Sequence, residues 1–252
     1  MKVAVITPFC NEPPHWIEEC RASVARQSVK CDHFFVGDAP KAEVPLSIAS
    51  AAYVILLPAN VNDFGDTPRA VGSMYVAGLG YDAIAFLDAD NMHESSHIET
   101  LLGLCIESGA SVVTSRRKFV RIDGSYMAEC LTSDGQTFCD ANCLFVTRKA
   151  FHLMAYWALM NRDYHAIDDR VMWHIIRRSS VSIAHTGQAT VLYRATHAGF
   201  YKDLSEPPPV GVKDSTTNKI PSALARWEQA GNPSLRIVQR YTKYQPPIGN
   251  VK

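Results

Sequence analysis

The stretch AIAFLDADN, residues 83–91, contains the pattern on which the expected fold of this sequence rests. Its first five residues are apolar and predict a buried β-strand, and Asp88 and Asp90 follow where that strand ends. Ligands of open α/β sheets bind beyond the carboxyl ends of the strands. Two carboxylates on either side of a small residue can face the same divalent cation, and Mg²⁺ and Mn²⁺ prefer oxygen ligands. An isolated Asp-x-Asp more often forms a turn or a cap, so its place after a buried strand favours a metal site.

Similar apolar runs alternate with helical patterns around this stretch. Strands are predicted over residues 3–6, 33–36 and 53–57, and helices are predicted after Pro13-Pro14, after Thr67-Pro68 and from residue 98 up to Gly109. This alternation predicts an α/β fold with a mostly parallel central sheet flanked by helices.

The second half of the chain is less regular. Strands are predicted over residues 111–121, 143–147 and 181–196, and helices over residues 150–160, 169–178 and 221–230. The run Glu206-Pro207-Pro208-Pro209 cannot continue a helix or a central strand. We expect one domain over residues 1–200, with an N-terminal half (1–92) and a C-terminal half (93–200), followed by a proline-containing tail (201–252).

Composition excludes several classes of protein. Among the 252 residues, 25 Lys and Arg balance 25 Asp and Glu, so no overall charge indicates a nucleic-acid partner. No segment approaches the roughly 20 apolar residues of a membrane span, and the start MKVAVITPFCNE is interpreted as a buried strand and not as a signal peptide. The seven cysteines include no Cys-x-x-Cys pair, so free thiols in a reducing cytoplasm are expected.

Three segments together resemble the family 2 glycosyltransferases. VAVITPFCNE (residues 3–12) resembles their opening strand and loop, and residues 83–91 are similar to the segment that carries their DxD motif. FVGD (residues 35–38) resembles their second strand, although Gly37 stands where the family usually has a first Asp. The resemblance covers about residues 3–180. It implies a GT-A (nucleotide-diphospho-sugar transferase) fold and a Mn²⁺- or Mg²⁺-dependent transfer from a nucleotide-diphosphate sugar, with UDP as the family's commonest nucleotide. Residues 1–200 are then one catalytic domain with a nucleotide-binding half (1–92) and an acceptor half (93–200), and the tail (201–252) is expected to be a lid ordered by the donor.

The resemblance also implies roles for single residues. It makes Asp90 the main metal ligand, with Asp88 binding the ribose or the metal through water. Family members usually have an Arg in the helix before the DxD strand. Arg69 is the nearest candidate, but it lies one position out of register and is equally explained as a solvated helix residue. The remaining residues implied to contact the nucleotide sugar are Thr7, Pro8, Asn11, Glu12, Asp38 and Ala89.

A catalytic base is expected at Asp168-Asp169. Inverting transfer needs a carboxylate that takes the proton of the acceptor hydroxyl, and this pair precedes a helical pattern, similar to the family's acidic pair whose second member is the base. That resemblance indicates Asp169. Asp is also a favoured N-cap, so one of the two is expected to cap the helix. The helix N-terminus is expected to lower the pKa of Asp169 and to keep it an anion.

Two further groups of residues are candidates for metal and acceptor binding. Some GT-A enzymes use a C-terminal His as a metal ligand, so His185 and His197 are both candidates, although a lone His is more often a hydrogen-bonded surface residue. Asp140 and Asn142 lie in a segment that resembles the acceptor-side loop of the family and are candidates for bonding sugar hydroxyls. Trp173 is a candidate for stacking on an acceptor sugar, but its apolar neighbours are typical of a core residue.

The resulting hypothesis is an inverting single displacement onto a glycan or glycolipid acceptor, in the cytoplasm and in polysaccharide biosynthesis by analogy. Without a membrane span, any membrane contact is expected to be peripheral. A retaining mechanism would make Asp169 a positioning group. A sugar-phosphate nucleotidyltransferase or a dehydrogenase needs a glycine-rich loop after the first strand, which PFCNE (residues 8–12) does not supply. The alternative outside catalysis is a degenerate nucleotide-sugar-binding or assembly subunit.

Overall fold

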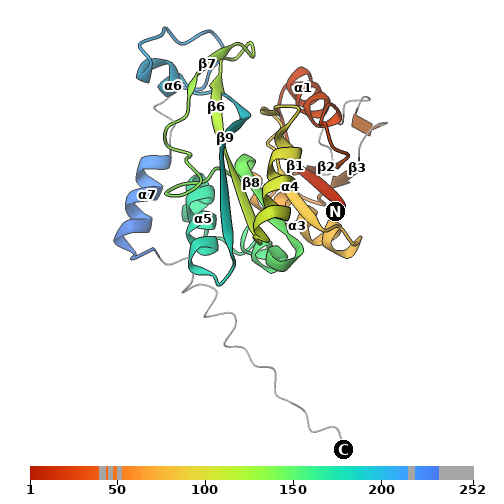
Figure 1. Cartoon of the computed structure of the whole chain (residues 1–252). Coiled ribbons are helices and arrows are strands. Elements are labelled where there is room, and N and C mark those ends of the chain that lie inside the picture. The colour runs from red at the N-terminus through yellow and green to blue at the C-terminus, as the bar shows by residue number, and fades with distance from the viewer. Residues whose placement is uncertain (40–43, 45–47, 50–52, 215–218, 233–252) are drawn as a thin grey trace, which may run out of the picture.

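The computed structural model describes residues 1–39, 44, 48–49, 53–214 and 219–232. Its strands are β1 (Val3–Phe9), β2 (Asp32–Gly37), β3 (Tyr53–Leu56), β4 (Ala83–Phe86), β5 (Met92–His93), β6 (Val112–Val120), β7 (Tyr126–Glu129), β8 (Leu144–Thr147) and β9 (Ile183–Arg194). The α-helices are α1 (Pro14–Ala25), α3 (Asp66–Gly78), α4 (His97–Ser108), α5 (Asp168–Arg178), α6 (Ala198–Asp203) and α7 (Ile220–Gln229). Figure 1 shows the central sheet with helices on both sides.

The strands of the described residues form one sheet in the order β3-β2-β1-β4-β8-β6-β9-β5, with β7 paired to β6. Strands β3, β2, β1 and β4 are all parallel, as the alternating pattern predicts. Antiparallel pairing begins where β8 joins β4 and β6, while β6 and β9 are parallel. The parallel N-terminal half therefore brings the carboxyl ends of β1, β2 and β4 to one edge of the sheet.

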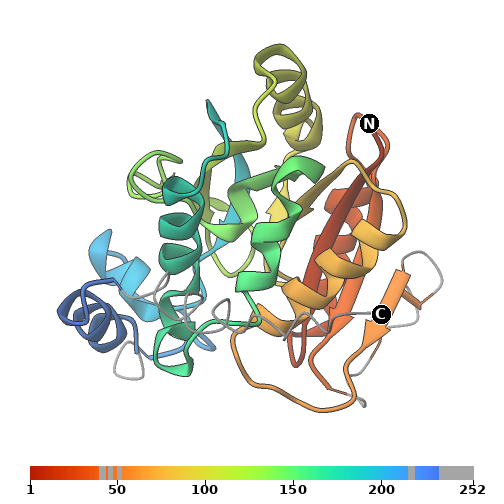
Figure 2. The same ribbon diagram turned by 90° about the horizontal axis from the view of Figure 1, so that it is seen from below.

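Alternate residues of the central strands pack into two separate cores. Ile6 and Phe86 belong to the core beneath α3 and α5, whereas Val5 and Ala85 belong to the core beneath α1 and α4. This follows from the period of two in a strand. Figure 2 shows the two sets of helices on opposite sides of the sheet. Asp88 lies two residues after Phe86 and contacts Arg69 of α3, whereas Ala89 and Asp90 belong to the turn that follows the strand.

Two glycines allow α3 to approach the sheet closely. Gly65, with φ of 91°, makes the left-handed turn that precedes the helix. A Cβ atom on Gly72 would lie 2.8 Å from Ile6 Cγ2, so only glycine permits this spacing between the helix and β1. The close packing of α3 positions Arg69 one turn after Gly65, at the edge where β1 and β4 end.

The second half differs from the sequence prediction in two places. Residues Arg148–Tyr156 form a 3₁₀ segment where a longer helix is predicted, and a further one covers Arg162–Ile167. The region predicted as one or two strands after residue 181 is the single strand β9. The helices predicted over residues 169–178 and 221–230 are present as α5 and α7.

The predicted domain boundary at residue 200 falls inside a packed segment. Tyr201 is 2% exposed, and its hydroxyl accepts a hydrogen bond from the Ile122 N–H at 3.0 Å. Glu206 pairs with Arg121 at 2.7 Å, and His197 forms an isolated bridge with Lys213. Single residues of the predicted tail therefore contact the preceding part of the chain as far as residue 213. Residues 215–218 and 233–252 of that tail lie outside the described residues.

None of the described helices combines the length and the apolar character that crossing a membrane requires.

Candidate active site

A cavity of about 500 Å³ lies at the carboxyl ends of β1 and β4. It is lined by residues of the β1–α1 loop, the start of α3, the DxD segment and the segment after β9. The lining residues are Pro8, Phe9, Cys10, Asn11, Glu12, Pro13, Trp16, Asp38, Asn62, Phe64, Gly65, Pro68, Arg69, Asp88, Ala89, Asp90, Tyr193, Thr196, His197 and Lys213. Seven of the eight residues predicted to bind the nucleotide sugar line this cavity, and only Thr7 does not. They are Pro8, Asn11, Glu12, Asp38, Arg69, Asp88 and Ala89.

Asp90 is the carboxylate that the protein leaves available in this cavity. Among the described residues, no hydrogen bond or ion pair engages its side chain, whereas both oxygens of Asp88 have protein partners. Burial, followed by the charges of Asp88 and Glu12, raises the pKa of Asp90 to about 7. The local field therefore disfavours a third negative charge and favours a cation beside Asp90.

Arg69 links the DxD motif to the acidic pair on α5. It is 4% exposed, and its guanidinium lies 2.5 Å from Asp88 Oδ1 and 3.2 Å from Asp168 Oδ2. Burial alone would lower the pKa of Arg69, but the carboxylates of Asp88 and Asp168 outweigh it, and the pKa is raised. Arg69 is thus no solvated helix residue. The offset of one position along the chain does not matter, because the helix and the strand are brought together by packing and not by spacing in sequence.

Asn142 fixes the position of Asp88 by hydrogen bonds, and Asp140 fixes the position of Asn142 in the same way. The Asn142 amide donates to Asp88 Oδ2 at 2.8 Å, and its oxygen accepts from the Asp88 backbone N–H at 2.6 Å. Asp140 accepts from the Asn142 amide at 2.6 Å and forms an ion pair with Arg117. Both residues are at most 2% exposed. The prediction that they face acceptor hydroxyls is wrong for this arrangement, because their polar atoms are buried and already bonded within the protein.

Asp168 and Asp169 begin α5 next to Arg69. The N-cap position belongs to Ile167, so neither aspartate is the capping residue that the sequence predicts. Asp169 accepts a hydrogen bond from the Ala141 N–H at 3.1 Å. The pKa of Asp169 is raised well above its usual value by burial and by the charges of Asp168 and Asp140. This is opposite to the predicted lowering, because burial among carboxylates outweighs the helix N-terminus.

Neither aspartate of this pair lines the 500 Å³ cavity itself. Asp168 forms an ion pair with Arg69, and Arg69 lines the cavity. Asp169 is partly exposed and lies one residue further along α5. Asp169 therefore lies beside this cavity and not in its wall.

Thr7 does not belong to the cavity, so its predicted contact with the donor is wrong. Its side chain is fully buried, and its hydroxyl lies 2.8 Å from His33 Nε2 on the face covered by α1. The period of two along β1 explains the error, because Thr7 points away from the side to which Pro8 contributes. Asp38 does line the cavity, and its two oxygens accept from the Val61 and Asn62 N–H groups at 2.9 and 3.0 Å.

The two predicted histidine ligands occupy different places. His185 bonds Thr114 at 2.8 Å near the start of β9 and does not line the cavity, so its prediction as a ligand of the same metal is wrong. His197 lines the cavity, and its Nδ1 atom is buried without a hydrogen-bond partner. Within the described part of the chain, no three His, Cys, Asp or Glu side chains gather closely enough to enclose a metal ion. His197 therefore does not complete a preformed set of three ligands with Asp88 and Asp90.

Sequence reasoning missed Arg194, which supports Asp90 from the far side. Arg194 is 1% exposed, donates from Nε to the Asp90 backbone oxygen at 2.9 Å, and pairs with Glu19. Its guanidinium also lies 5.2 Å from the ring of Trp16. No local pattern marks this residue, since 104 residues separate it from Asp90. Lys213 was also missed; it lines the cavity, and its charge lowers the pKa of Asp90, against the larger effect of burial.

Trp173 does not line the 500 Å³ cavity that contains Asp88 and Asp90, which is called the aspartate cavity below. It is 3% exposed, and its Nε1 donates to the Gln136 carbonyl at 3.1 Å. Its apolar neighbours on α5, such as Val171 and Ile175, belong to the core as the helical spacing indicates. Trp173 contributes instead to the wall of a second cavity.

Comparison with known proteins gives one family and one group of structures. The sequence model described as Glycosyl transferase family 2 matches residues 4–166, which is more than half of the 252-residue chain. None of the curated proteins matches the chain.

The matching structures include S. aureus TarS. The crystal structure of TarS 1–349 matches with a TM-score of 0.60 and 16% identity, over 80% of this chain and 63% of that one. The same fragment in complex with UDP matches with a TM-score of 0.59 and 16% identity, over the same shares of the two chains. Its complex with UDP-GlcNAc matches with 0.54 and 14% identity, over 77% and 58%. The chain thus spans less than two thirds of the TarS fragment, and at these identities the likeness shows the shared GT-A fold.

Proposed function

The chain belongs to glycosyl transferase family 2, and we propose that it transfers a sugar from a nucleotide-diphosphate donor to a hydroxyl group of a glycan or glycolipid acceptor. The observation that carries the proposal is the unengaged carboxylate of Asp90, which lines a 500 Å³ cavity with Asp88 and Arg69. UDP is the proposed nucleotide. The similar TarS fragment was crystallised with UDP and with UDP-GlcNAc, which supports this choice.

The cavity fits a divalent cation held by Asp90, with Asp88 beside it. The raised pKa of Asp90 reflects burial and crowding with other carboxylates, which a cation would relieve. Two carboxylates without a third protein ligand suit Mg²⁺ or Mn²⁺, which complete their shell with substrate phosphates and water. When bound, such an ion supplies Lewis-acid stabilisation of the charge on the departing diphosphate.

The residues of the chain then divide the reaction between them. Asp169 accepts the proton of the acceptor hydroxyl while that oxygen forms a bond to the anomeric carbon. The bond from the anomeric carbon to the diphosphate oxygen breaks, and the nucleoside diphosphate leaves with the electron pair. Arg69 neutralises Asp88 and Asp168 on either side of this centre. Because the attack comes from the face opposite the leaving group, the anomeric configuration inverts.

Two alternatives give different products. In a retaining reaction, Asp169 positions the substrate and the product keeps the configuration of the donor, which NMR of the product distinguishes. In a degenerate binding subunit, the donor binds but is neither transferred nor hydrolysed. A donor hydrolysis assay separates that subunit from an enzyme.

The first test is calorimetric titration of UDP, GDP and CDP, each with Mn²⁺ and with EDTA. One nucleotide should bind in Mn²⁺ only, and Asp90→Ala should abolish its binding. The matched control is Asp203→Ala, which removes an exposed carboxylate at the end of α6, outside the cavity. Equal binding of the nucleotide in EDTA would contradict the metal site, and the absence of binding by all three nucleotides would contradict the transferase proposal.

A further inference from the structure

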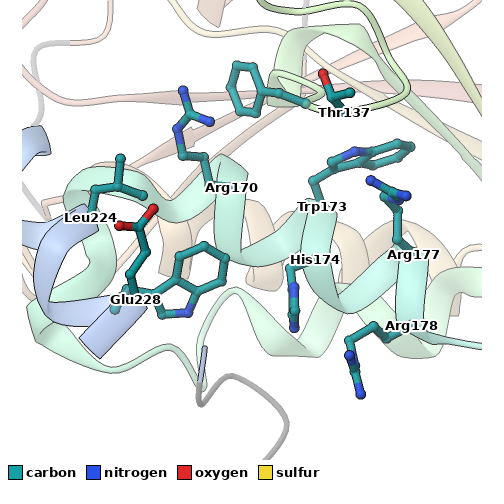
Figure 3. Close-up of a pocket in the computed structure, with 10 residues that line it drawn as sticks. Thr137, Arg170, Trp173, His174, Arg177, Arg178, Leu224 and Glu228 are labelled. Atoms are coloured by element: carbon teal, nitrogen blue, oxygen red, sulfur yellow. The ribbon is translucent and has the colours of Figure 1, made fainter. Parts of the chain in front are cut away.

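A second cavity, of about 440 Å³, lies between α5 and α7. Figure 3 shows its wall: side chains of α5 stand along one side, Leu224 and Glu228 lie on α7, and Thr137 lies on the loop at one edge. The α5 residues are Arg170, Trp173, His174, Arg177 and Arg178. Phe138 and Trp227 complete the lining, and none of these residues lines the aspartate cavity. This cavity is therefore a separate site, within the size range of small-molecule pockets of roughly 300–1,000 Å³.

The lining carries an excess of positive charge. Three arginines face a single carboxylate, that of Glu228. Within the part of the chain that the structure describes, Arg170, Arg177 and Arg178 form no ion pair, and Arg170 instead stacks on Phe138 at 4.4 Å. Burial, followed by the charges of Arg178 and Arg177, lowers the pKa of His174. Because the whole chain is formally neutral, this is a local concentration of charge that attracts anions.

A buried donor in the lining also lacks a partner. Trp227 is 8% exposed, and its Nε1 atom is buried without a hydrogen-bond acceptor. Trp173, on the opposite wall, uses its Nε1 for the Gln136 carbonyl. Leaving a buried N–H unpaired costs free energy.

Two elements run from this cavity to the proposed base. On α5, Asp169 directly precedes Arg170, and the rise of a helix places Arg177 roughly 12 Å further along the axis. The loop that contributes Phe138 to the cavity continues to Ala141, whose N–H bonds Asp169. Asp168, which directly precedes Asp169, contacts Arg69 in the aspartate cavity. Asp169 therefore lies between two cavities. One is the aspartate cavity, which is proposed to bind the donor and is called the donor cavity below. The other is the cavity between α5 and α7, which is called the basic cavity below.

We propose that the cavity between α5 and α7 binds phosphate groups of the acceptor, next to the hydroxyl that receives the sugar. The acceptor is then a phosphate-bearing glycan and not a neutral one. Guanidinium groups bind phosphate oxygens in paired, charge-assisted hydrogen bonds, and Phe138 and Leu224 supply apolar surface for the faces of sugar rings. The assignment of the ligand as acceptor rests on the proposed transferase function, whereas the binding of phosphate does not.

The binding test is calorimetric titration of inorganic tripolyphosphate in EDTA at low salt. Wild type should bind, and the double variant Arg177→Gln with Arg178→Gln should bind at least about tenfold more weakly, because each charge-assisted bond lost is worth that much or more.

Two controls locate the anion. Arg26→Gln removes an exposed arginine at the end of α1 and should leave the affinity unchanged. Lys213→Gln removes a cation of the donor cavity and should also leave it unchanged. If the double variant binds tripolyphosphate as wild type does, or if Lys213→Gln is the variant that loses binding, the proposed site is wrong.

A transfer assay tests the role of the ligand. Oligosaccharides are offered in phosphorylated and unphosphorylated pairs, with the nucleotide sugar at saturation. The phosphorylated member should be the better acceptor, and the double variant should raise its KM about tenfold or more while the affinity for UDP with Mn²⁺ is retained. Equal KM values for the two members would overturn the acceptor assignment. Failure of wild type to bind any nucleotide would instead overturn the transferase function, with tripolyphosphate binding still reporting on the basic cavity.

Discussion

The two ends of α5 carry opposite charges and are built in opposite ways. At the N-terminal end, Asp168 forms an ion pair with Arg69, which is 4% exposed. Toward the C-terminal end, Arg177 and Arg178 are exposed, and the described residues offer them no ion pair. Buried charges must be paired to be tolerated, so the stability of the fold depends on the ion pair at the N-terminal end. The unpaired charges of the second end contribute little to the fold and remain available to a ligand.

The largest expected effect is on turnover at the acidic end. Asp169→Asn should lower kcat by ~10²- to 10⁴-fold, because it removes the group that takes the acceptor proton. The affinity for UDP with Mn²⁺ should stay unchanged, since Asp169 does not line the donor cavity. Steady-state kinetics and calorimetry measure the two quantities. Asp163→Asn, an exposed aspartate shortly before α5, is the matched control. A variant with nearly full kcat would show that Asp169 is not the base.

Replacement of the buried arginine should cost stability. Arg69→Gln leaves Asp88 and Asp168 without their common cation. Breaking a buried ion pair in this way costs about 3–5 kcal/mol in the free energy of unfolding, which urea denaturation at neutral pH measures. A loss below about 1 kcal/mol, the usual range of an exposed pair, would mean that the two ends of α5 do not differ in this respect.

Loss of the hydrogen bonds from Asn142 to Asp88 should have a smaller effect than loss of Arg69, but the effect on metal-dependent binding should be measurable. Asn142→Ala removes both side-chain hydrogen bonds between Asn142 and Asp88. Outer-shell partners of this kind typically change metal affinity by ~10- to 100-fold, so Mn²⁺-dependent UDP binding should weaken within that range. Asn161→Ala, which alters a cap of a 3₁₀ segment, is the control. Unchanged binding would show that Asp88 keeps its position without Asn142.

The pH profile should report the crowding of carboxylates at the acidic end. The base must be ionised, and the pKa of Asp169 is raised by burial and then by Asp168. Activity should therefore fall with decreasing pH at a higher pH than for an ordinary aspartate, whose pKa is about 4. Asp168→Asn removes one negative charge and should move this acid limb of kcat/KM to lower pH. A limb that moves to higher pH would contradict the assignment of the titrating group.

The smallest expected effect is on stability at the basic end. Arg177→Gln should change the free energy of unfolding by less than about 0.5 kcal/mol, as is usual for exposed positions without partners. Urea denaturation of Arg177→Gln and Arg69→Gln under the same conditions compares the two losses in the free energy of unfolding. A loss similar to that of Arg69→Gln would indicate that Arg177 has a structural partner, and the basic cavity would lose its interpretation as a ligand site.

The prediction from sequence was most accurate in the parallel half. Residues 3–6, 33–36 and 53–57 predicted strands that are present as β1, β2 and β3, and α4 ends before Gly109 as predicted. These signals are local, because the buried run and the terminating residue lie within one element. Around residues 150–160 the same reasoning predicted a helix where a 3₁₀ segment is found, since no local pattern separates the two.

The sequence by itself determined the α/β class, the resemblance to family 2 and the pair Asp88 and Asp90 at the end of a buried strand. The period of two and the strand-end rule require only neighbouring residues. Only the tertiary structure decided that Thr7 faces α1, that Asn142 holds Asp88, and that the basic residues of α5 line a cavity with α7. Those contacts join residues distant in the chain, and their geometry depends on how the elements pack. Spacing along the sequence does not contain that information.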